Sequence, residues 1–239
     1  MELFQNGVRR VFKFSIVIPC YRDETPLARL LEQLRRLPHQ PDEIIVVDAA
    51  DSIRCAQLCE QSAVIRLVSE PCRGLQLGIG AAKARGDVLW FLHADAQLAA
   101  DPLAAMAAAI QRGAIGGYFR FRFANPRAWP AAILEPAIAL RCRLGVPYGD
   151  QGIFMQRTVY HQAGGHAPWP LFEEAPLVKA ARRLGRFVAL PEPIFVDSRR
   201  WQRDGWWRRS LKNRWLALRF MSGAAPQDLA AHYHSKNGS

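Results

Sequence analysis

The segment Gly86-Asp87-Val88-Leu89-Trp90-Phe91-Leu92-His93-Ala94-Asp95 predicts the central strand of an α/β fold. Its apolar core, residues 88–92, is as long and continuous as a strand that is buried on both faces. His93 and Asp95 follow directly, and side chains two residues apart on an extended segment point the same way. We therefore expect both to face a crevice at the carboxyl end of the strand, where open α/β sheets bind ligands.

Two interpretations of Asp95 follow from this local pattern. A carboxylate at the tip of a strand suits a hard divalent cation that bridges to phosphate oxygens of a substrate. The alternative is that Asp95 caps the helix that follows it. The pattern alone leaves both interpretations open.

Three more strand candidates precede this segment, at residues 14–19, 43–48 and 63–68. A helix that begins at Thr25-Pro26, an N-cap and first-turn pair, separates the first two and carries an apolar face. A second helix candidate spans residues 74–85. Strands that alternate with helices at this spacing predict a mostly parallel, doubly wound sheet.

The pattern changes after Asp101-Pro102, which starts an alanine-rich helix. Residues 119–123 alternate Phe with Arg, the signature of a strand with one face in water. Glu173-Glu174 opens another helix candidate, and residues 187–196 predict short strands around two prolines. No internal repeat and no clear linker is present, so we expect one domain with an elaborated second half.

The segment 205–221 predicts a basic amphipathic helix. Its apolar stripe holds Trp207, Leu211, Trp215 and Leu218, and a second stripe holds basic residues. One interpretation is an element that lies on a membrane surface. The favoured alternative is a helix whose apolar stripe packs on the core while its basic residues face water, since surface helices are usually amphipathic.

The charge balance favours anionic partners. The 239 residues include 32 Lys and Arg against 21 Asp and Glu, a net charge of +11. The basic residues are dispersed and accompany no nucleic-acid motif, so we expect no nucleic-acid partner. The five cysteines form no paired CxxC sets, which predicts a reduced chain without a zinc site. No apolar stretch is long enough to span a bilayer.

Seven segments together resemble one family, the family-2 glycosyltransferases of the GT-A fold, in order and spacing. The closest likeness is to the bacterial subgroup associated with arsenosugar biosynthesis, also described as selenodomain-associated transferases. The resemblance runs from about residue 14 to 221. Its segments are Ile16 to Tyr21, Ile44 to Asp48, Arg73-x-x-Gln76-x-x-x-Gly80-Ala81, Gly86 to Asp95, Pro147 to Gly152, Glu173-Glu174 and Arg200-Trp201.

This resemblance implies a single GT-A, Rossmann-like domain over residues 1–239, with a mostly parallel central sheet flanked by helices. Residues 14–112 would bind a nucleotide-sugar donor, and residues 113–221 would form the acceptor half and the C-terminal amphipathic helix. The implied activity is a metal-dependent, inverting transfer of a sugar to an acceptor hydroxyl, with Mg²⁺ or Mn²⁺ as cofactor. The acceptor would be a small arsenosugar-type molecule or a lipid-linked one. The implied location is the cytoplasm, with peripheral contact at the inner membrane surface through residues 205–221.

The resemblance also assigns roles to individual residues. Glu174 corresponds to the general base, in preference to its neighbour Glu173, whose charge would stabilise the start of the helix. Asp95, with His93 beside it, corresponds to the metal ligand. The donor residues would be Pro19, Tyr21, Asp48, Arg73 and Gln76. The acceptor-side residues would be Asp150, Gln151, Arg200 and Trp201.

Several positions depart from the family pattern. Ala49-Ala50-Asp51 follows the second strand where many relatives have a Gly-Gly-Ser-type loop, and Arg22 and Gly78 replace asparagines. Glu174 stands where aspartate is usual, which lengthens the base by one methylene. These departures motivate an alternative hypothesis, a degenerate nucleotide-binding or membrane-surface module without catalytic activity.

Overall fold

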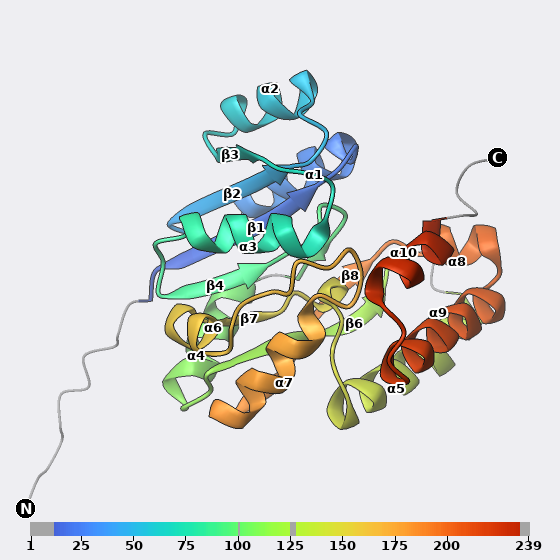
Figure 1. Cartoon of the computed structure of the whole chain (residues 1–239). Coiled ribbons are helices and arrows are strands. Elements are labelled where there is room, and N and C mark those ends of the chain that lie inside the picture. Colours follow the sequence, from blue (N-terminus) through green and yellow to red (C-terminus); the bar gives the residue numbers. More distant parts are fainter. Residues whose placement is uncertain (1–11, 100, 125–127, 235–239) are drawn as a thin grey trace, which may run out of the picture.

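The first half of the chain alternates strands with helices (Figure 1). The computed structural model describes residues 12–99, 101–124 and 128–234. Strand β1 pairs in parallel with β2 and β4, and β2 pairs in parallel with β3. The α/β fold class is confirmed, and this half is parallel as expected. Its elements are β1 (Phe14–Cys20), α1 (Glu24–Arg35), β2 (Glu43–Asp48), α2 (Ile53–Gln61), β3 (Ile65–Val68), α3 (Arg73–Lys83) and β4 (Val88–Phe91).

The second half adds antiparallel pairings, so the sheet is mixed, and within the described residues four of its seven strand pairings are parallel as predicted. The strand order is β3-β2-β1-β4-β7-β6-β8-β5, in which β7 runs antiparallel to both β4 and β6. Helix α5 and the turn at residues 149–151 lie between β6 and β7, and the chain enters β7 in the direction opposite to both of its neighbours. The elements are β5 (Gln97–Leu98), α4 (Pro102–Gln111), β6 (Gly116–Phe123), α5 (Trp129–Leu144), η1 (Gly149–Gln151), β7 (Phe154–Gln156), α6 (Arg157–Gln162), α7 (Glu174–Leu184), β8 (Phe187–Val196), α8 (Arg199–Asp204), α9 (Trp206–Met221) and α10 (Pro226–His234).

Several elements differ from their prediction. Helix α1 begins at Glu24 with Asp23 in the N-cap position, so Thr25 lies inside the helix. Residues 187–196 form one continuous strand instead of short strands. A register shift between Tyr118 and Arg120 accommodates Pro191, because a residue in a bulge does not need to donate a ladder N–H. Helices α2, α5, α6, α8 and α10 and strand β5 were not predicted.

Helices cover both faces of the sheet and bury its central strands. Trp90 of β4 packs in the cluster that includes residues of α1, α2 and α4. Leu89 and Phe91 pack on the other face, in the cluster that includes residues of α3 and α7. All three side chains are at most 3% exposed, so the prediction of a strand buried on both faces is confirmed.

Helix α3 lies unusually close to its neighbours because of its glycines. A Cβ atom on Gly74 would lie 1.9 Å from the carbonyl oxygen of Ala167, and one on Gly80 would lie 2.3 Å from Val17. A Cβ on Gly78 would meet nothing within 4 Å. The backbone of α3 therefore needs glycine at residues 74 and 80 but not at residue 78.

We expect Gly74→Ala and Gly78→Ala to change stability in opposite directions. The first forces backbone atoms apart and lowers the free energy of unfolding by about 1–3 kcal/mol or more. The second adds a better helix former in open space and raises it by about 0.5–1 kcal/mol. Urea unfolding of both variants measures the difference, and equal effects would contradict this account of α3 packing.

Candidate functional site

Asp48, at the carboxyl end of β2, is fully buried and anchors the following loop. Its carboxylate accepts hydrogen bonds from the backbone N–H groups of Ala50 and Ser52, both at 2.9 Å. Arg66 of β3 donates to the same carboxylate at 2.8 Å. Burial raises the pKa of Asp48, but these hydrogen bonds outweigh burial and leave the pKa below its ordinary value. The Asp48 carboxylate is therefore ionised, and groups of the protein itself already donate hydrogen bonds to it.

Gln76 of α3 ties the ends of β1 and β2 together. Its side-chain NH₂ group donates to the carbonyl oxygens of Cys20, at 3.0 Å, and of Val47, at 2.8 Å. This position fixes the tip of β1, where Pro19 and Tyr21 lie, against the tip of β2. A direct contact of Gln76 or Pro19 with a donor stays a prediction.

Tyr21, just past β1, is 45% exposed. The Arg22 guanidinium lies 5.3 Å from the centre of its ring, and Arg22 itself has a φ of 56°. Such a conformation is uncommon for a residue other than glycine, and strained residues of this kind cluster at functional sites. The ring of Tyr21 is thus presented to solvent at the strand tip.

Arg73, the first residue of α3, faces the acidic pair at the start of α7. Its Nη1 atom lies 3.7 Å from Oε1 of Glu173, which is fully buried. Glu174 is 4% exposed. Burial raises the pKa of Glu174 well above its usual value, the charge of Glu173 raises it further, and Arg73 opposes both. The site therefore holds two adjacent carboxyl groups against one guanidinium.

Strained backbone positions this acidic pair. Phe172, directly before Glu173, has a φ of 61°, which is an outlier for a bulky side chain. Its ring stacks on Phe220 of α9, with 4.7 Å between centroids. Packing of this kind holds a strained residue in place, and such strain clusters at active sites.

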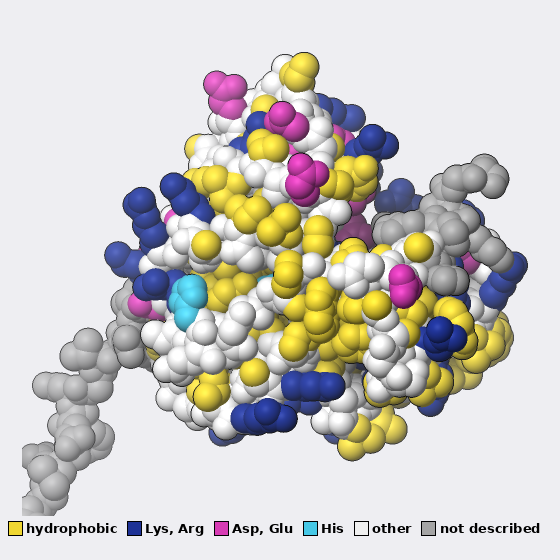
Figure 2. All heavy atoms as spheres, in the orientation of Figure 1, with side chains coloured by type: hydrophobic (Ala, Val, Ile, Leu, Met, Phe, Trp, Pro, Cys, Tyr) yellow, Lys and Arg dark blue, Asp and Glu magenta, His cyan; other side chains and the backbone are white. Residues whose placement is uncertain are grey.

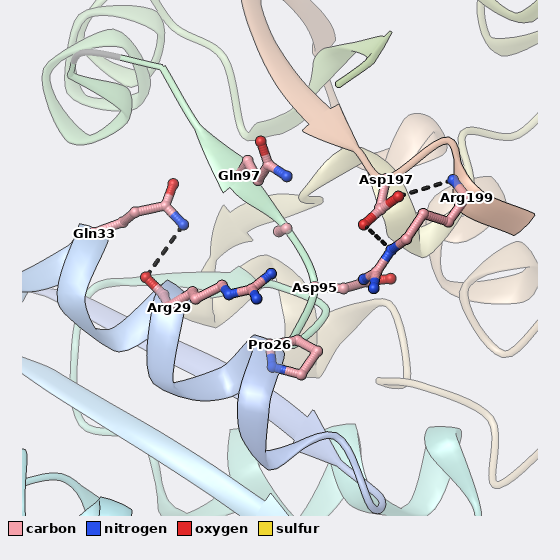
Figure 3. A pocket seen from close by; sticks show the side chains of 8 residues that line it. Pro26, Arg29, Gln33, Asp95, Gln97, Asp197 and Arg199 are labelled. Atoms are coloured by element: carbon pink, nitrogen blue, oxygen red, sulfur yellow. Dashed lines mark hydrogen bonds and ion pairs between the residues drawn. The ribbon is translucent and has the colours of Figure 1, made fainter. Parts of the chain in front are cut away.

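Asp95 lines a cavity of about 140 Å³ between α1, β5 and the end of β8. Figure 3 shows Arg29 and Gln33 of α1 on one side of this cavity, and Asp197 with Arg199 on the other. The cap interpretation of Asp95 is wrong, because the N-cap of the next helix is Asp101.

His93 lies apart from that cavity lining. A Cβ on Gly149 would lie 2.8 Å from Nε2 of His93, so the ring packs against η1. The chain leaves the strand at Phe91 and turns, with Ala96 N–H donating to the carbonyl of His93. The alternation expected of an extended segment therefore does not apply to residues 93 and 95.

A single carboxylate such as Asp95 suits a divalent cation only when a substrate supplies further ligands to the same cation. Within the described ranges, no group of three or more His, Cys, Asp or Glu side chains is arranged to hold a metal ion. Mg²⁺ is commonly held by one or two carboxylates, waters and substrate phosphates, so a single aspartate fits that pattern.

The charges of Asp95 and Arg73 both act on the pKa of Asp150 of η1. Burial raises its pKa to about 6; Arg141 and Arg73 counter this rise, and the charge of Asp95 adds to it. Asp150 and Arg73 likewise affect Glu174. The mutual influence of these groups indicates that residues from α3, α7, η1 and the loop after β4 surround one site.

The other predicted acceptor-side residues have structural contacts. Gln151 is 1% exposed, and its Oε1 accepts from the Cys142 thiol and from Tyr148 N–H. The Trp201 ring lies 5.0 Å from that of Phe123 in an aromatic cluster. Arg200 belongs to α8, and its side chain lies outside the described part of the structure.

Two arginines that the sequence did not single out shape the site. Arg66 pairs with Asp48, and it is the only charged residue of β3. Arg141 of α5 lies 3.8 Å over the Tyr148 ring and donates to the carbonyl of Val146 at 2.7 Å. A lone charge inside a strand is a usable signal for Arg66, whereas no local signal marks Arg141.

Asp150→Asn should reduce the pH dependence of stability. The native carboxyl has a pKa of about 6 against an ordinary 3.8, so the folded state holds its proton more tightly than the unfolded chain. The contribution of Asp150 to the free energy of unfolding is fully present below pH 3.8, and it is lost as the pH rises through about 6. Over that window wild type should lose on the order of 1 kcal/mol relative to Asp150→Asn. Urea unfolding at stepped pH measures the difference, and parallel curves would contradict it.

Comparison with known proteins identifies the family and the fold of this chain. Residues 15–167 match the family described as glycosyl transferase family 2. No curated protein matches the sequence.

Several solved structures share the fold at low sequence identity. The mannosyltransferase PcManGT from Pyrobaculum calidifontis, in complex with GDP-Man and Mn²⁺, is 16% identical with a TM-score of 0.67, over 96% of this chain and 71% of that one. S. aureus TarS is 16% identical with a TM-score of 0.61, over 77% of this chain. TarS 1-349 with UDP-GlcNAc is 17% identical with a TM-score of 0.62, over 78% of this chain. The chain spans 36% and 59% of the lengths of those two TarS chains.

These neighbours show the fold, and the expected GT-A architecture is confirmed. The family match covers more than half of the 239 residues. The protein therefore belongs to glycosyl transferase family 2.

Proposed function

We propose that this protein is a metal-dependent, inverting glycosyltransferase that moves a sugar from a nucleoside-diphosphate sugar to an acceptor hydroxyl. The observation that carries the proposal is the grouping of Arg73 with the carboxyl groups of Asp95, Asp150 and Glu174. Residues 14–112 are assigned to the donor and residues 113–221 to the acceptor. Complexes of structural neighbours with UDP-GlcNAc and with GDP-Man and Mn²⁺ support a donor of this class.

Arg73 has the chemistry to stabilise the leaving diphosphate. A guanidinium presents paired donors to phosphate oxygens, and preorganised positive charge acts most strongly where charge develops. A divalent cation shared between Asp95 and the diphosphate would supply further Lewis-acid stabilisation. Asp95 holds that position in the proposal, with Mg²⁺ or Mn²⁺ as the cofactor.

Glu174 is the proposed general base. In an inverting transfer the acceptor oxygen attacks the anomeric carbon as the bond to the diphosphate oxygen breaks, and the acceptor proton passes to the carboxylate. Glu173 is ion-paired with Arg73, at 3.7 Å, and we assign the proton to its neighbour Glu174. The raised pKa of Glu174 makes it a stronger base than an ordinary carboxylate once its proton has been lost.

The acceptor proposal follows the motif resemblance. The likeness to the arsenosugar subgroup supports a small hydroxylated acceptor in the cytoplasm, and a lipid-linked acceptor is the alternative. None of the helices in the described residues is long and apolar enough to cross a bilayer. Any membrane contact through residues 205–221 would therefore be peripheral.

A second candidate, a nucleotide-binding module without turnover, is favoured by the loop after β2. Asp48 is already occupied by Arg66 and by backbone N–H groups, and Asp51 has a φ of 48°. A panel of nucleotide sugars with Mn²⁺ or Mg²⁺, followed by release of nucleoside diphosphate, separates the two candidates. Consumption of one donor supports the transferase. Calorimetric binding of UDP or GDP without turnover of any donor supports the module.

A further inference from the structure

Helices α5 and α9 turn their large apolar side chains toward solvent. In α5, Trp129, Ile133, Leu140 and Leu144 are 69, 52, 59 and 81% exposed. In α9, the apolar stripe is 45 to 70% exposed and consists of Trp207, Leu211, Trp215, Leu218 and Met221. We call these nine residues the α5/α9 face. Large contiguous exposed apolar patches mark interaction sites, whereas single exposed residues do not.

The inward side of α9 holds both apolar and charged side chains. Leu216 is its one buried residue in the described structure, and Trp206, Ala217 and Phe220 are partly buried against the core. Arg209, with a side chain 11% exposed, pairs with Asp204 and lies 5.0 Å over the Trp201 ring. The interpretation that the apolar stripe of residues 205–221 packs on the core is therefore wrong. The stripe is directed outward instead.

The two helices form one continuous surface. The rings of Trp129 and Trp207, at the two helix starts, lie 5.9 Å apart. Val146 and Tyr148, just past the end of α5, share a hydrophobic cluster with Leu216 in the second half of α9. Figure 2 shows hydrophobic side chains interspersed with basic ones at the lower right, where Figure 1 places α5 and α9.

Charge on this surface is of one sign. Helix α9 contains Arg208, Arg209, Lys212, Arg214 and Arg219 and no acidic residue. The acidic residue of α5 is Glu135, which is 5% exposed and ion-paired with Arg122. Exposed tryptophans and leucines bordered by arginines, with no exposed carboxylate on either helix, match an interface that is apolar inside and anionic at its surface.

We propose that the α5/α9 face docks on the surface of an anionic lipid bilayer. Tryptophan rings and leucines would enter the boundary between headgroups and acyl chains, while Arg208, Arg214 and Arg219 contact lipid phosphates. A second copy of the chain fits less well, because paired α9 helices would bring together Arg208, Arg214 and Arg219 of both copies, and α9 contains no acidic residue. This docking is independent of the proposed transfer reaction.

Vesicle flotation tests the proposal directly. Wild-type protein should float with phosphatidylcholine vesicles that contain phosphatidylglycerol, and should do so less with phosphatidylcholine alone or in high salt. Leu140→Glu and Leu211→Glu should each lower the bound fraction at least ~10-fold, because each places a charge in the apolar boundary. Ile53→Glu is the matched control, since Ile53 is 78% exposed but lies on α2 beside the opposite edge of the sheet.

Each result decides for or against the bilayer. Loss of flotation in Leu140→Glu and Leu211→Glu, with Ile53→Glu unchanged and all melting temperatures retained, supports the proposal. Wild-type protein that stays at the bottom with anionic vesicles overturns it. So does a lipid-free dimer in light scattering that Leu211→Glu dissociates, because the face would then bind a second copy. An equal loss of flotation in Ile53→Glu would show that the effect comes from the change in net charge alone, and would also overturn the proposal.

Discussion

Glu174→Gln is expected to lower kcat by about 10²–10⁴-fold, the range attributed to a positioned general base. Glutamine keeps the shape of the side chain but does not accept the proton of the acceptor hydroxyl. Because burial already favours the uncharged form of Glu174, the substitution should not destabilise the fold. Affinity for the nucleoside diphosphate should change little, since the base contacts the acceptor side.

The pH profile distinguishes this role from a structural one. Wild-type kcat/KM should rise with pH as Glu174 loses its proton, at a pH above the ordinary carboxyl range. That rise should be absent in Glu174→Gln. Glu173→Gln is the matched control, because it changes a neighbouring buried carboxyl that faces Arg73. A near wild-type Glu174→Gln beside an inactive Glu173→Gln would assign the base to Glu173.

Asp95→Asn should lower the metal-dependent transfer rate by about 10²–10³-fold, which corresponds to several kcal/mol of lost charge stabilisation. Asparagine fits the same space but brings no negative charge to a cation. Calorimetric titration should show that Mn²⁺ strengthens UDP binding in wild type and no longer does so in Asp95→Asn. Metal-free binding should be the same in both proteins.

Asp197→Asn is the control for this experiment. Asp197 lines the same cavity, but its carboxylate is paired with Arg199 at 2.5 Å (Figure 3). It should therefore retain the effect of Mn²⁺ on UDP binding. If Asp197→Asn loses that effect and Asp95→Asn keeps it, the metal ligand is Asp197.

Local pattern predicted the elements that have one strong signal. The apolar run of residues 44–47 gave β2 with the bounds Glu43–Asp48, and the continuous run after Gly86 gave β4. The second half was harder, because Pro191 and Pro193 interrupt the pattern of β8, and the register shift that keeps β8 continuous is defined only by its pairing with β6. Parallel pairing in the first half followed from alternation, whereas the direction of β7 depends on tertiary structure.

Site residues divide in the same way. A motif position places Arg73 at one helix start and Glu174 at another, and an ion pair of Arg73 with Glu173 brings those two helix starts together. Sequence does not reveal that Asp48 is paired with Arg66, because that contact joins residues 18 positions apart on neighbouring strands. The outward direction of the apolar stripe on α9 is likewise invisible in its helical periodicity, which defines a stripe but not the side that faces water.

The buried ion pair at the tip of β2 bears on donor selectivity. A carboxylate has about four lone-pair sites, and Asp48 already accepts from Ala50, Ser52 and Arg66. If the donor base lies at Asp48, one of the proposed donor residues, its ring N–H would meet a group with little remaining capacity to accept it. Discrimination among nucleobases would then be weak, and preference among donors would come from the sugar.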